Sequence, residues 1–263
     1  MNDIMNHVVI STLAGASEFY VVVPFYQEEQ YLAATLAALS AQTDLDFTLV
    51  LVDNGSTDAS AAIAQQFIAA SPMPARLIHE SQKGTGAAAD TGFRHAIAHG
   101  ARWIARTDAD CLPARDWVVR LKDALVRDGL AFVGGRIAPR PDERLSLAER
   151  VILPVLIAVA ERYGRWTRRG PQFKYPYFMA AGNNVAIAAD LYEQAGGFPR
   201  SRIEELHEDR VLSERVRLLT ARAEWRRDIV VYNSARRVRA YGFLNVLRWY
   251  RNHGYRPSVV DVR

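Results

Sequence analysis

Short, continuous apolar runs alternate with segments rich in Ala and Leu along the first half of the chain. Continuous apolar runs are typical of strands buried on both faces of a parallel sheet. We predict strands over Phe19–Val23, Phe47–Val52, Arg76–His79, Trp103–Arg106 and Val185–Ala188, and helices over Tyr31–Ala41, Ala59–Ala70, Ala87–His99 and Arg210–Leu219. This alternation predicts an α/β fold with a mostly parallel central sheet and helices on both of its faces.

Charged residues stand close to the ends of the predicted strands. Glu28 follows the first strand, Asp53 the second and the triplet Asp108-Ala109-Asp110 the fourth, while Lys83 precedes the third helix. Ligands of parallel sheets bind at the carboxyl ends of the strands, so we expect these side chains to share one site. Carboxylate oxygens are ligands that Mg²⁺ and Mn²⁺ prefer. An Asp-x-Asp triplet is also common in solvated turns, and its interpretation as a metal site depends on the other charged residues expected at the same edge.

A series of motifs resembles family 2 of the glycosyltransferases. The resemblance rests on Val23–Glu29, Val52–Asp58, Lys83–Gly84, Asp108–Asp110, Ala181–Asn184, Gly196–Pro199 and Glu208–Asp209, and it covers about residues 19 to 215. Several motifs in this order are far more specific than any one of them. The resemblance implies a GT-A (Rossmann-like) fold, a nucleotide-diphosphate sugar donor, a divalent cation (Mn²⁺ or Mg²⁺) and inversion at the anomeric carbon.

The resemblance also implies how residues divide around the donor. Asp110 is the expected metal ligand, and Asp108 either shares the metal or approaches the ribose. Asp53 occupies the place of the family's base-recognising carboxylate; an Asx turn or a helix cap is the alternative, and we assign the cap to Ser56 or Asp58. The residues expected against the nucleotide sugar are Pro24, Tyr26, Glu28, Asp53, Lys83, Gly84, Asp108, Asn183, Arg236 and Arg237.

The acceptor side centres on Glu208-Asp209, next to a predicted helix. An inverting transferase needs a carboxylate base opposite the leaving group. The resemblance places that base at Asp209, with Glu208 as the alternative base or as a residue that orients the acceptor. Acidic residues at a helix N-terminus also stabilise the helix, by roughly 0.3–1 kcal/mol each. Acceptor contacts are expected from Gly182, Asn184 and Trp249.

The C-terminal segment carries two weaker resemblances. Ser234–Arg237 resembles a basic tail that in some relatives folds back over the diphosphate. Asn245-Val-Leu-Arg248-Trp249 resembles the Gln-x-x-Arg-Trp signature of processive polysaccharide synthases, with Asn in place of Gln. Such synthases carry membrane spans, whereas the apolar run Val151–Ala160 is about half of the roughly 20 residues that a span needs. We therefore expect transfer of a single sugar, and whether the Asn245–Trp249 motif acts as it does in synthases stays open.

Composition and charge narrow the choice of partners. The first 135 residues carry 9 Lys or Arg and 15 Asp or Glu, and the rest carries 24 and 14, so the formal charge changes from −6 to +10. Three interpretations of the basic half are open: an anionic acceptor or membrane surface, a clamp for the diphosphate, or a genome that favours Arg codons. No nucleic-acid recognition motif accompanies it, which disfavours DNA or RNA. The single cysteine, Cys111, and the lack of a visible signal peptide predict a cytoplasmic protein, with peripheral membrane contact left open.

We expect one domain over residues 1–263, in which about residues 19–110 bind the nucleotide and about residues 111–263 bind the acceptor. The expected activity is metal-dependent, inverting transfer of one sugar from a UDP- or GDP-linked donor to a hydroxyl or amine acceptor. A nucleotidyltransferase is one alternative, but Pro24–Glu29 lacks the Gly-rich, basic loop that it needs. A nucleotide-binding homologue without turnover is the other, and the intact Asp-x-Asp and Glu208-Asp209 disfavour it. The pattern leaves open the sugar, the choice of UDP or GDP, the acceptor (small molecule, lipid-linked or glycan) and the oligomeric state.

Overall fold

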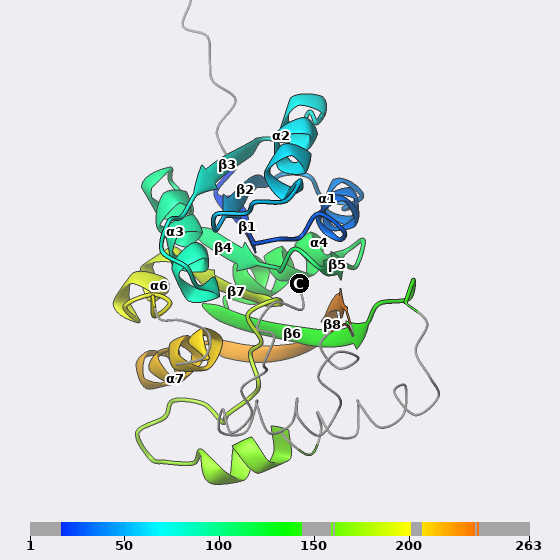
Figure 1. Ribbon diagram of the computed structural model, residues 1–263. Helices are drawn as coiled ribbons and strands as arrows, with labels where there is room; N and C mark the ends of the chain where they lie inside the picture. The colour runs from blue at the N-terminus through cyan, green and yellow to red at the C-terminus, as the bar shows by residue number, and fades with distance from the viewer. Residues whose placement is uncertain (1–16, 144–158, 160, 201–206, 235, 237–263) are drawn as a thin grey trace, which may run out of the picture.

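A mixed sheet of eight strands lies at the centre of the part of the chain that the computed structural model describes, residues 17–143, 159, 161–200, 207–234 and 236 (Figure 1). The strand order is β3-β2-β1-β4-β7-β6-β8-β5. The strands are β1 (Phe19–Phe25), β2 (Thr48–Asp53), β3 (Ala75–His79), β4 (Trp103–Arg106), β5 (Cys111–Pro113), β6 (Phe132–Pro139), β7 (Val185–Ala188) and β8 (Ala223–Asn233). The helices are α1 (Leu32–Ser40), α2 (Ser60–Ala70), α3 (Thr85–Ala98), α4 (Trp117–Lys122) with its π-helical continuation η1 (Asp123–Arg127), α6 (Ala189–Gln194) and α7 (Glu208–Leu219).

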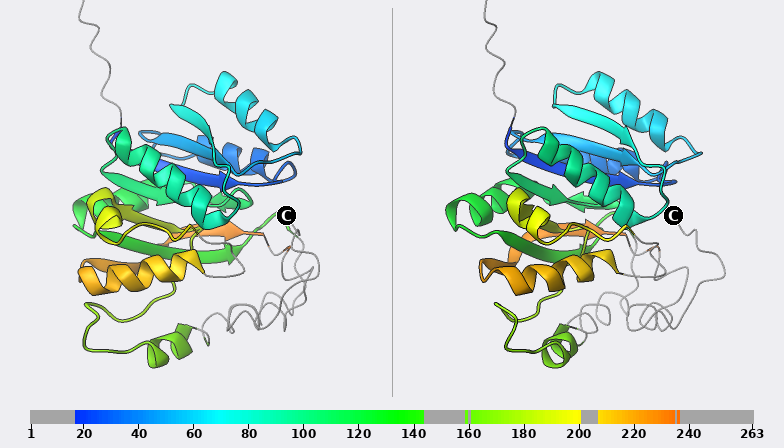
Figure 2. Two further views of the ribbon diagram at one scale, coloured as in Figure 1. Left: turned by 60° about the vertical axis from the view of Figure 1, so that its left-hand side comes forward. Right: turned by 90° about the vertical axis from the view of Figure 1, so that its left-hand side faces the viewer.

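The first four strands have the parallel arrangement that the sequence predicts. β1 pairs in parallel with β2 and β4, and β2 pairs in parallel with β3. Because side chains alternate along a strand, Val21 and Val23 pack with α1 and α2, whereas Tyr20 and Val22 pack with α3 on the other face. Helices therefore cover both faces of the sheet (Figure 2), which is why these strands are continuous apolar runs.

The other half of the sheet is mixed, and much of it goes beyond the prediction. β7, which was predicted, pairs antiparallel with β4 and β6, while β8 runs parallel to β6 and antiparallel to β5. β6 contains Gly134-Gly135, with a register shift after Gly135, and β8 begins with the polar stretch Glu224–Asp228. Neither strand has a continuous apolar pattern, so the sequence does not reveal them.

The parallel strands bring their carboxyl ends to one edge of the sheet, and the loops beyond that edge carry the predicted site. At this edge α3 begins at Thr85, earlier than predicted, and α7 begins at Glu208, so that Glu208 and Asp209 open the helix as the sequence predicts. Within the described ranges, none of the helices combines the length and the apolar character needed to cross a membrane.

Candidate active site

A small hollow lies at the carboxyl ends of β1, β2 and β4. It brings together residues more than two hundred positions apart in the sequence, and its lining is Pro24, Phe25, Tyr26, Glu28, Asn54, Thr85, Ala88, Asp108, Ala109, Asp110 and Arg236. A larger hollow of about 320 Å³ lies at the opposite end of the sheet, beside Phe19 and Trp103, and none of the predicted site residues lines it. The chemistry-bearing residues thus gather at the edge that parallel-sheet topology predicts.

Arg236 joins two of the predicted acidic residues. Its Nη1 atom donates to Oε2 of Glu28 at 2.7 Å, and its Nη2 atom contacts Oε1 of Glu28 and lies 3.0 Å from Oδ2 of Asp110. Its guanidinium also lies over the ring of Tyr31, 4.7 Å from the centroid. Burial alone lowers the pKa of Arg236, but the hydrogen bonds to Glu28 and the charge of Asp110 raise it above its usual value. A permanently charged guanidinium therefore sits where the sequence predicts a cation site.

Asp108 and Asp110 supply hard oxygen ligands, which suit Mg²⁺ or Mn²⁺. Asp110 is buried, whereas the side chain of Asp108 is 31% exposed and has one oxygen, Oδ1, held by Arg106. Over the described ranges, no three His, Cys, Asp or Glu side chains converge on one point. A divalent cation would therefore need ligands besides the described carboxylates, and the oxygens of a diphosphate are of the kind that it prefers. The described residues fit a metal shared with a donor better than one that they enclose by themselves.

Arg106 is a functional candidate that the sequence analysis missed. Its side chain is only 1% exposed, with Nη2 3.1 Å from Oδ1 of Asp108 and Nη1 3.2 Å from Oε1 of Glu208. A Cβ atom at Gly182 would lie 2.9 Å from its Nη1 atom, so a larger residue at this position would displace the Arg106 guanidinium. The only signal in the sequence is a basic residue that closes the apolar run of β4. Arg106 connects the Asp-x-Asp side of the site to the pair on α7.

Glu208 and Asp209 differ in how they are held. Asp209 accepts a hydrogen bond from the Gly182 N–H at 3.1 Å on Oδ2 and another from the Arg210 N–H at 2.6 Å on Oδ1, so backbone amides orient its carboxylate. Glu208 is buried and paired with Arg106. Burial raises the pKa of both carboxyls above their usual values, and the nearby Arg106 charge opposes this shift.

The side chain of Asp53 stabilises a local turn, which is the alternative to its role in recognising the nucleobase. Its Oδ1 atom accepts a hydrogen bond from the Ser56 N–H at 2.8 Å, and its Oδ2 atom lies 3.6 Å from Nδ1 of His79. Asp58, one of the two predicted caps, accepts from the N–H of Ser60 at the start of α2 at 3.0 Å. These contacts leave the role of Asp53 toward a nucleobase as a prediction, while its neighbour Asn54 lines the hollow.

Lys83 and Gly84 form the start of α3 beside the hollow. The Lys83 ammonium donates to the carbonyl oxygens of Asn54 and Gly55 at 2.9 and 3.0 Å and lies 3.8 Å from the centroid of the Tyr26 ring. Gly84 has a φ of 139°, which favours glycine, and its N–H donates to Oδ1 of Asn54 at 2.9 Å. Hydrogen bonds from Lys83 and Gly84 therefore hold the loop to the carbonyl oxygen and the side chain of Asn54.

Asn183 and Asn184 have different environments despite being neighbours. Asn184 is completely buried; its Oδ1 atom accepts from Nε1 of Trp117 at 2.9 Å, and its Nδ2 atom donates to the carbonyls of Arg136 and Ile229 at 2.9 and 3.1 Å. The predicted acceptor contact of Asn184 is therefore wrong: its polar atoms are committed to joining β6, α4 and β8. Asn183 lies beside Cys111, and its buried Oδ1 atom accepts no hydrogen bond from the described residues.

Other predicted elements lie beyond what the structure describes. Arg237, Trp249 and the motif Asn245–Trp249 fall outside the described residues.

Cys111 is buried beside Asp110, and burial raises the pKa of its thiol well above the usual value. Because a thiol binds metals as the thiolate, this environment disfavours Cys111 as a metal ligand.

Comparison with known proteins bears on the family and the fold of the chain. Residues 20–193 match the family described as Glycosyl transferase family 2. The chain is 30% identical to glycosyltransferase AglE of Haloferax volcanii over 188 residues, 70% of this chain and 56% of AglE. It is 28% identical to the polyprenol monophosphomannose synthase of Mycolicibacterium smegmatis over 130 residues, 49% of each. The chain thus spans about half the length of these two relatives.

Solved structures with the same fold include two with nucleotides. The mannosyltransferase PcManGT from Pyrobaculum calidifontis, in complex with GDP-Man and Mn²⁺, superimposes with a TM-score of 0.62 at 24% identity, over 89% of this chain and 61% of that one. S. aureus TarS 1-349 in complex with UDP gives a TM-score of 0.62 at 15% identity, over 82% and 60%. At these identities the likeness shows the fold alone, which is GT-A.

Proposed function

Because the chain belongs to glycosyl transferase family 2, we propose that it transfers a single sugar from a UDP- or GDP-linked donor to a hydroxyl or amine acceptor, with inversion at the anomeric carbon. The observation that carries this proposal is the convergence of acidic and basic side chains at the carboxyl ends of the parallel strands, in the hollow lined by Glu28, Asp108, Asp110 and Arg236. In this proposal about residues 19–110 bind the nucleotide and the chain from about residue 111 onward binds the acceptor, while Asn183 and Arg236 of this second part also contact the donor.

The leaving group of such a transfer is a nucleoside diphosphate, whose negative charge must be stabilised as the bond to the sugar breaks. A Mn²⁺ or Mg²⁺ ion held by Asp110, with Asp108, supplies part of that stabilisation when bound. Arg236 offers a second cation, because a guanidinium binds phosphate oxygens in a bidentate manner. Its contacts with Glu28 and Asp110 keep the guanidinium beside the expected diphosphate position.

The donor's other groups are assigned by position around the same hollow. We assign the base to Pro24, Tyr26 and Asp53, the ribose to Glu28, and a phosphate to the Lys83–Gly84 loop. Asn183 is assigned to a hydroxyl of the donor sugar. The buried Oδ1 atom of Asn183 supports this last assignment, since a buried acceptor with no donor among the described residues is unusual and points to an external partner.

Asp209 is the base that takes the proton from the acceptor in this proposal. Its two backbone hydrogen bonds fix the direction of the carboxylate, and its raised pKa makes it a better proton acceptor than an exposed aspartate once it is ionised. Glu208 is paired with Arg106, and this ion pair makes its carboxylate less available to the acceptor than that of Asp209. Arg106, which contacts both Glu208 and Asp108, then fixes the position of the acceptor side of the site relative to Asp108.

Isothermal titration with UDP and with GDP, each in Mn²⁺ and in EDTA, tests the donor assignment. One of the two nucleotides is expected to bind, and to bind at least tenfold more weakly in EDTA, because the diphosphate and Asp110 share the cation. A folded protein that binds neither nucleotide in either buffer would contradict the proposal. Equal affinity in Mn²⁺ and EDTA would retain the nucleotide site and remove the metal from it.

We also infer peripheral contact with an anionic membrane, through a short helix over residues 161–167 at the far side from α2 (Figure 1). Tyr163 and Trp166 are 59% and 68% exposed, their rings lie 6.4 Å apart, and Val159 nearby is 58% exposed. Aromatic residues of this kind are enriched at membrane interfaces. The exposed cations Arg162, Arg165 and Arg169 match the charge of anionic lipid, at about 1 kcal/mol for each basic residue near the surface. Such a surface would place the site near a lipid-linked acceptor.

Cosedimentation with lipid vesicles checks this inference. The protein is expected to pellet with vesicles of phosphatidylglycerol and phosphatidylcholine, to pellet less with phosphatidylcholine alone, and to be released by salt. The double substitution Tyr163→Ser with Trp166→Ser is expected to abolish pelleting. A matched control replaces Leu218 and Leu219, which are exposed on α7, by serine and should leave pelleting unchanged. Equal loss in both variants, or no pelleting of the wild type, would contradict the inference.

A further inference from the structure

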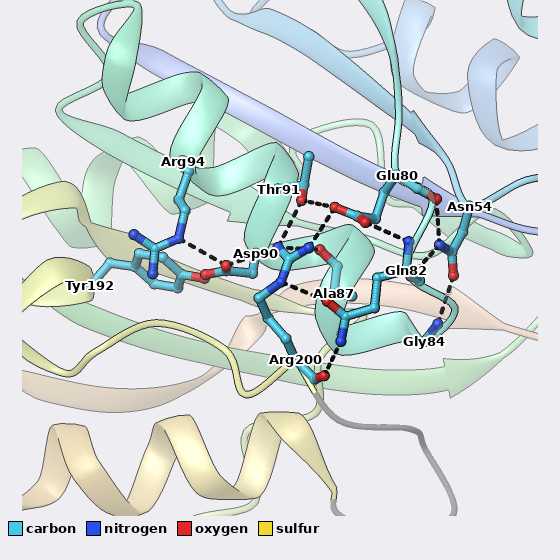
Figure 3. Close-up of polar contacts among 10 residues, drawn as sticks. All are labelled: Asn54, Glu80, Gln82, Gly84, Ala87, Asp90, Thr91, Arg94, Tyr192 and Arg200. Carbon is cyan, nitrogen blue, oxygen red and sulfur yellow. Dashed lines mark hydrogen bonds and ion pairs between the residues drawn. The ribbon is translucent and has the colours of Figure 1, made fainter.

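The segment Gly196–Arg200, which precedes the candidate base in the chain, is fastened to α3 at several points (Figure 3). Gly197 has a φ of +69°, and a Cβ atom there would lie 2.6 Å from Oδ1 of Asp90. From the other side, a Cβ atom at Gly86 would overlap the carbonyl oxygen of Pro199. The positive φ favours glycine at position 197, and the approach of the Pro199 carbonyl to Gly86 brings the backbone of the segment against the backbone of the helix.

Arg200 uses all three of its guanidinium nitrogens in this contact. Its Nη2 atom donates to Oε2 of Glu80 at 2.7 Å, and its Nε atom donates to Oε1 of Gln82 at 3.1 Å. Its Nη1 atom contacts Oδ2 of Asp90 at 3.2 Å and Oγ1 of Thr91 at 2.9 Å. The carbonyl oxygen of Arg200 also accepts from Nε2 of Gln82. Arg200 therefore binds both the β3–α3 loop and α3 itself.

The β3–α3 loop that Arg200 binds is itself hydrogen-bonded to Asn54, which lines the donor hollow. Asn54 donates to the carbonyl oxygens of Glu80 and Gln82, each at 2.8 Å, and accepts from the N–H of Gly84. Asn54 lines the hollow, and Gly84 is expected against the donor phosphates. Gln82 thus faces Arg200 with its side chain and Asn54 with its backbone, as Figure 3 shows.

We propose that Arg200 is a positioning residue that holds the Gln82–Gly84 loop in the arrangement that binds the donor diphosphate, and couples that loop to the segment leading to Glu208-Asp209. The inference rests on the proposed function, because it assigns a role to Arg200 in that same site. Arg200 is expected to touch neither donor nor acceptor. Its effect is on the geometry of the residues that do.

The carboxylates that Arg200 binds have other partners, so its removal should not unfold the protein. Asp90, whose side chain is only 1% exposed, also accepts from Nε of Arg94 and from the hydroxyl of Tyr192, both at 2.8 Å. Glu80 also accepts from the hydroxyl of Thr91 and from the N–H of Gln82. A variant that lacks Arg200 therefore leaves no buried charge without a partner.

The test compares Arg200→Met with Arg94→Met. Both substitutions remove a cation from Asp90, but only Arg200 contacts Glu80 and Gln82. Arg200→Met is expected to weaken nucleotide binding about tenfold and to raise the KM for the donor more than it lowers kcat, since one charge-assisted hydrogen bond is worth about this factor. Arg94→Met should bind nucleotide as the wild type does. Arg200→Lys, which keeps the charge without the planar fork, should recover part of the affinity.

The outcomes separate this inference from the proposed function. Wild-type binding of UDP or GDP with an unchanged affinity in Arg200→Met would overturn the inference alone. Equal weakening in Arg94→Met and Arg200→Met, together with equal losses of Tm, would overturn it too, because the effect would then come from the stability of α3. A folded wild type that binds neither nucleotide overturns the proposed function and the inference with it.

Discussion

Replacing Asp209 with asparagine is expected to lower kcat by about 10²–10⁴-fold and to leave nucleotide binding unchanged, since that range is the usual contribution of a general base. Asparagine has the same shape, and its carbonyl oxygen can still accept the hydrogen bond that Oδ2 of Asp209 accepts from the Gly182 N–H. The variant loses the hydrogen bond that the Arg210 N–H donates to Oδ1, because an amide nitrogen cannot accept it, and it loses the capacity to take a proton from the acceptor. Steady-state kinetics and nucleotide titration on the same preparation measure both effects.

The pH profile and a neighbouring variant make this test specific. Because burial raises the pKa of Asp209, the acid limb of kcat is expected at a higher pH than an exposed aspartate would give, and activity falls as the pH drops through it. Glu208→Gln weakens the partner of buried Arg106, so we expect a loss of stability with a smaller effect on kcat. Near wild-type turnover in Asp209→Asn, with large loss in Glu208→Gln, would transfer the role of base to Glu208.

The parallel half of the fold can be predicted from sequence because its signals are local. β1, β2 and β4 are covered on both faces, so each is a continuous apolar run, and each is followed directly by the polar residues that meet at its carboxyl end. The order of residues along the chain is therefore enough to place Glu28, Asp108 and Asp110 in one site. β6 and β8 lack such a signal, because Gly134-Gly135 and a run of exposed polar residues interrupt their patterns.

Arg106 and Arg200 could not be identified from the sequence, because their partners lie far along the chain, whereas Arg236 was expected from the resemblance of Ser234–Arg237 to a basic tail. Arg106 binds Glu208 across 102 positions, Arg200 binds Glu80 across 120, and Arg236 binds Glu28 across 208. In the sequence they stand among many arginines whose excess has a compositional explanation. Folding distinguishes these three, because each is fixed by carboxylates at the edge of the sheet.

The sequence also cannot tell which of two adjacent asparagines faces the site. Asn183 and Asn184 precede β7 as an identical pair in the sequence, and both were expected to contact sugar or acceptor. Asn184 points into the interior, where Trp117 and two carbonyls bind it, whereas Asn183 lies beside Cys111 with an oxygen that has no donor among the described residues. Which of two neighbouring amides faces a site depends on the direction of the chain as it enters the strand.

Asp110→Asn is the second substitution for which we expect a large effect, a loss of about 10²–10³-fold in kcat/KM, which corresponds to the several kcal/mol of charge stabilisation that a bound metal provides. Asp110 is buried, and its carboxylate, whose Oδ2 atom contacts Arg236, is the group that would hold a divalent cation. Asparagine keeps the size of the side chain and removes its charge. Nucleotide affinity in Mn²⁺ should fall to the value that the wild type shows in EDTA.

The matched control is Asp142→Asn, which removes a carboxylate paired with Arg140 and 53% exposed, and it should keep wild-type affinity in both buffers. The contrary result would be informative about Arg236. If the wild type is equally active in Mn²⁺ and EDTA and Asp110→Asn keeps that activity, then the guanidinium of Arg236 stabilises the leaving diphosphate without a metal. In that case Arg236→Met, which leaves Asp110 and Glu28 in place, would show the large loss in its stead, because no other cation contacts both carboxylates among the described residues.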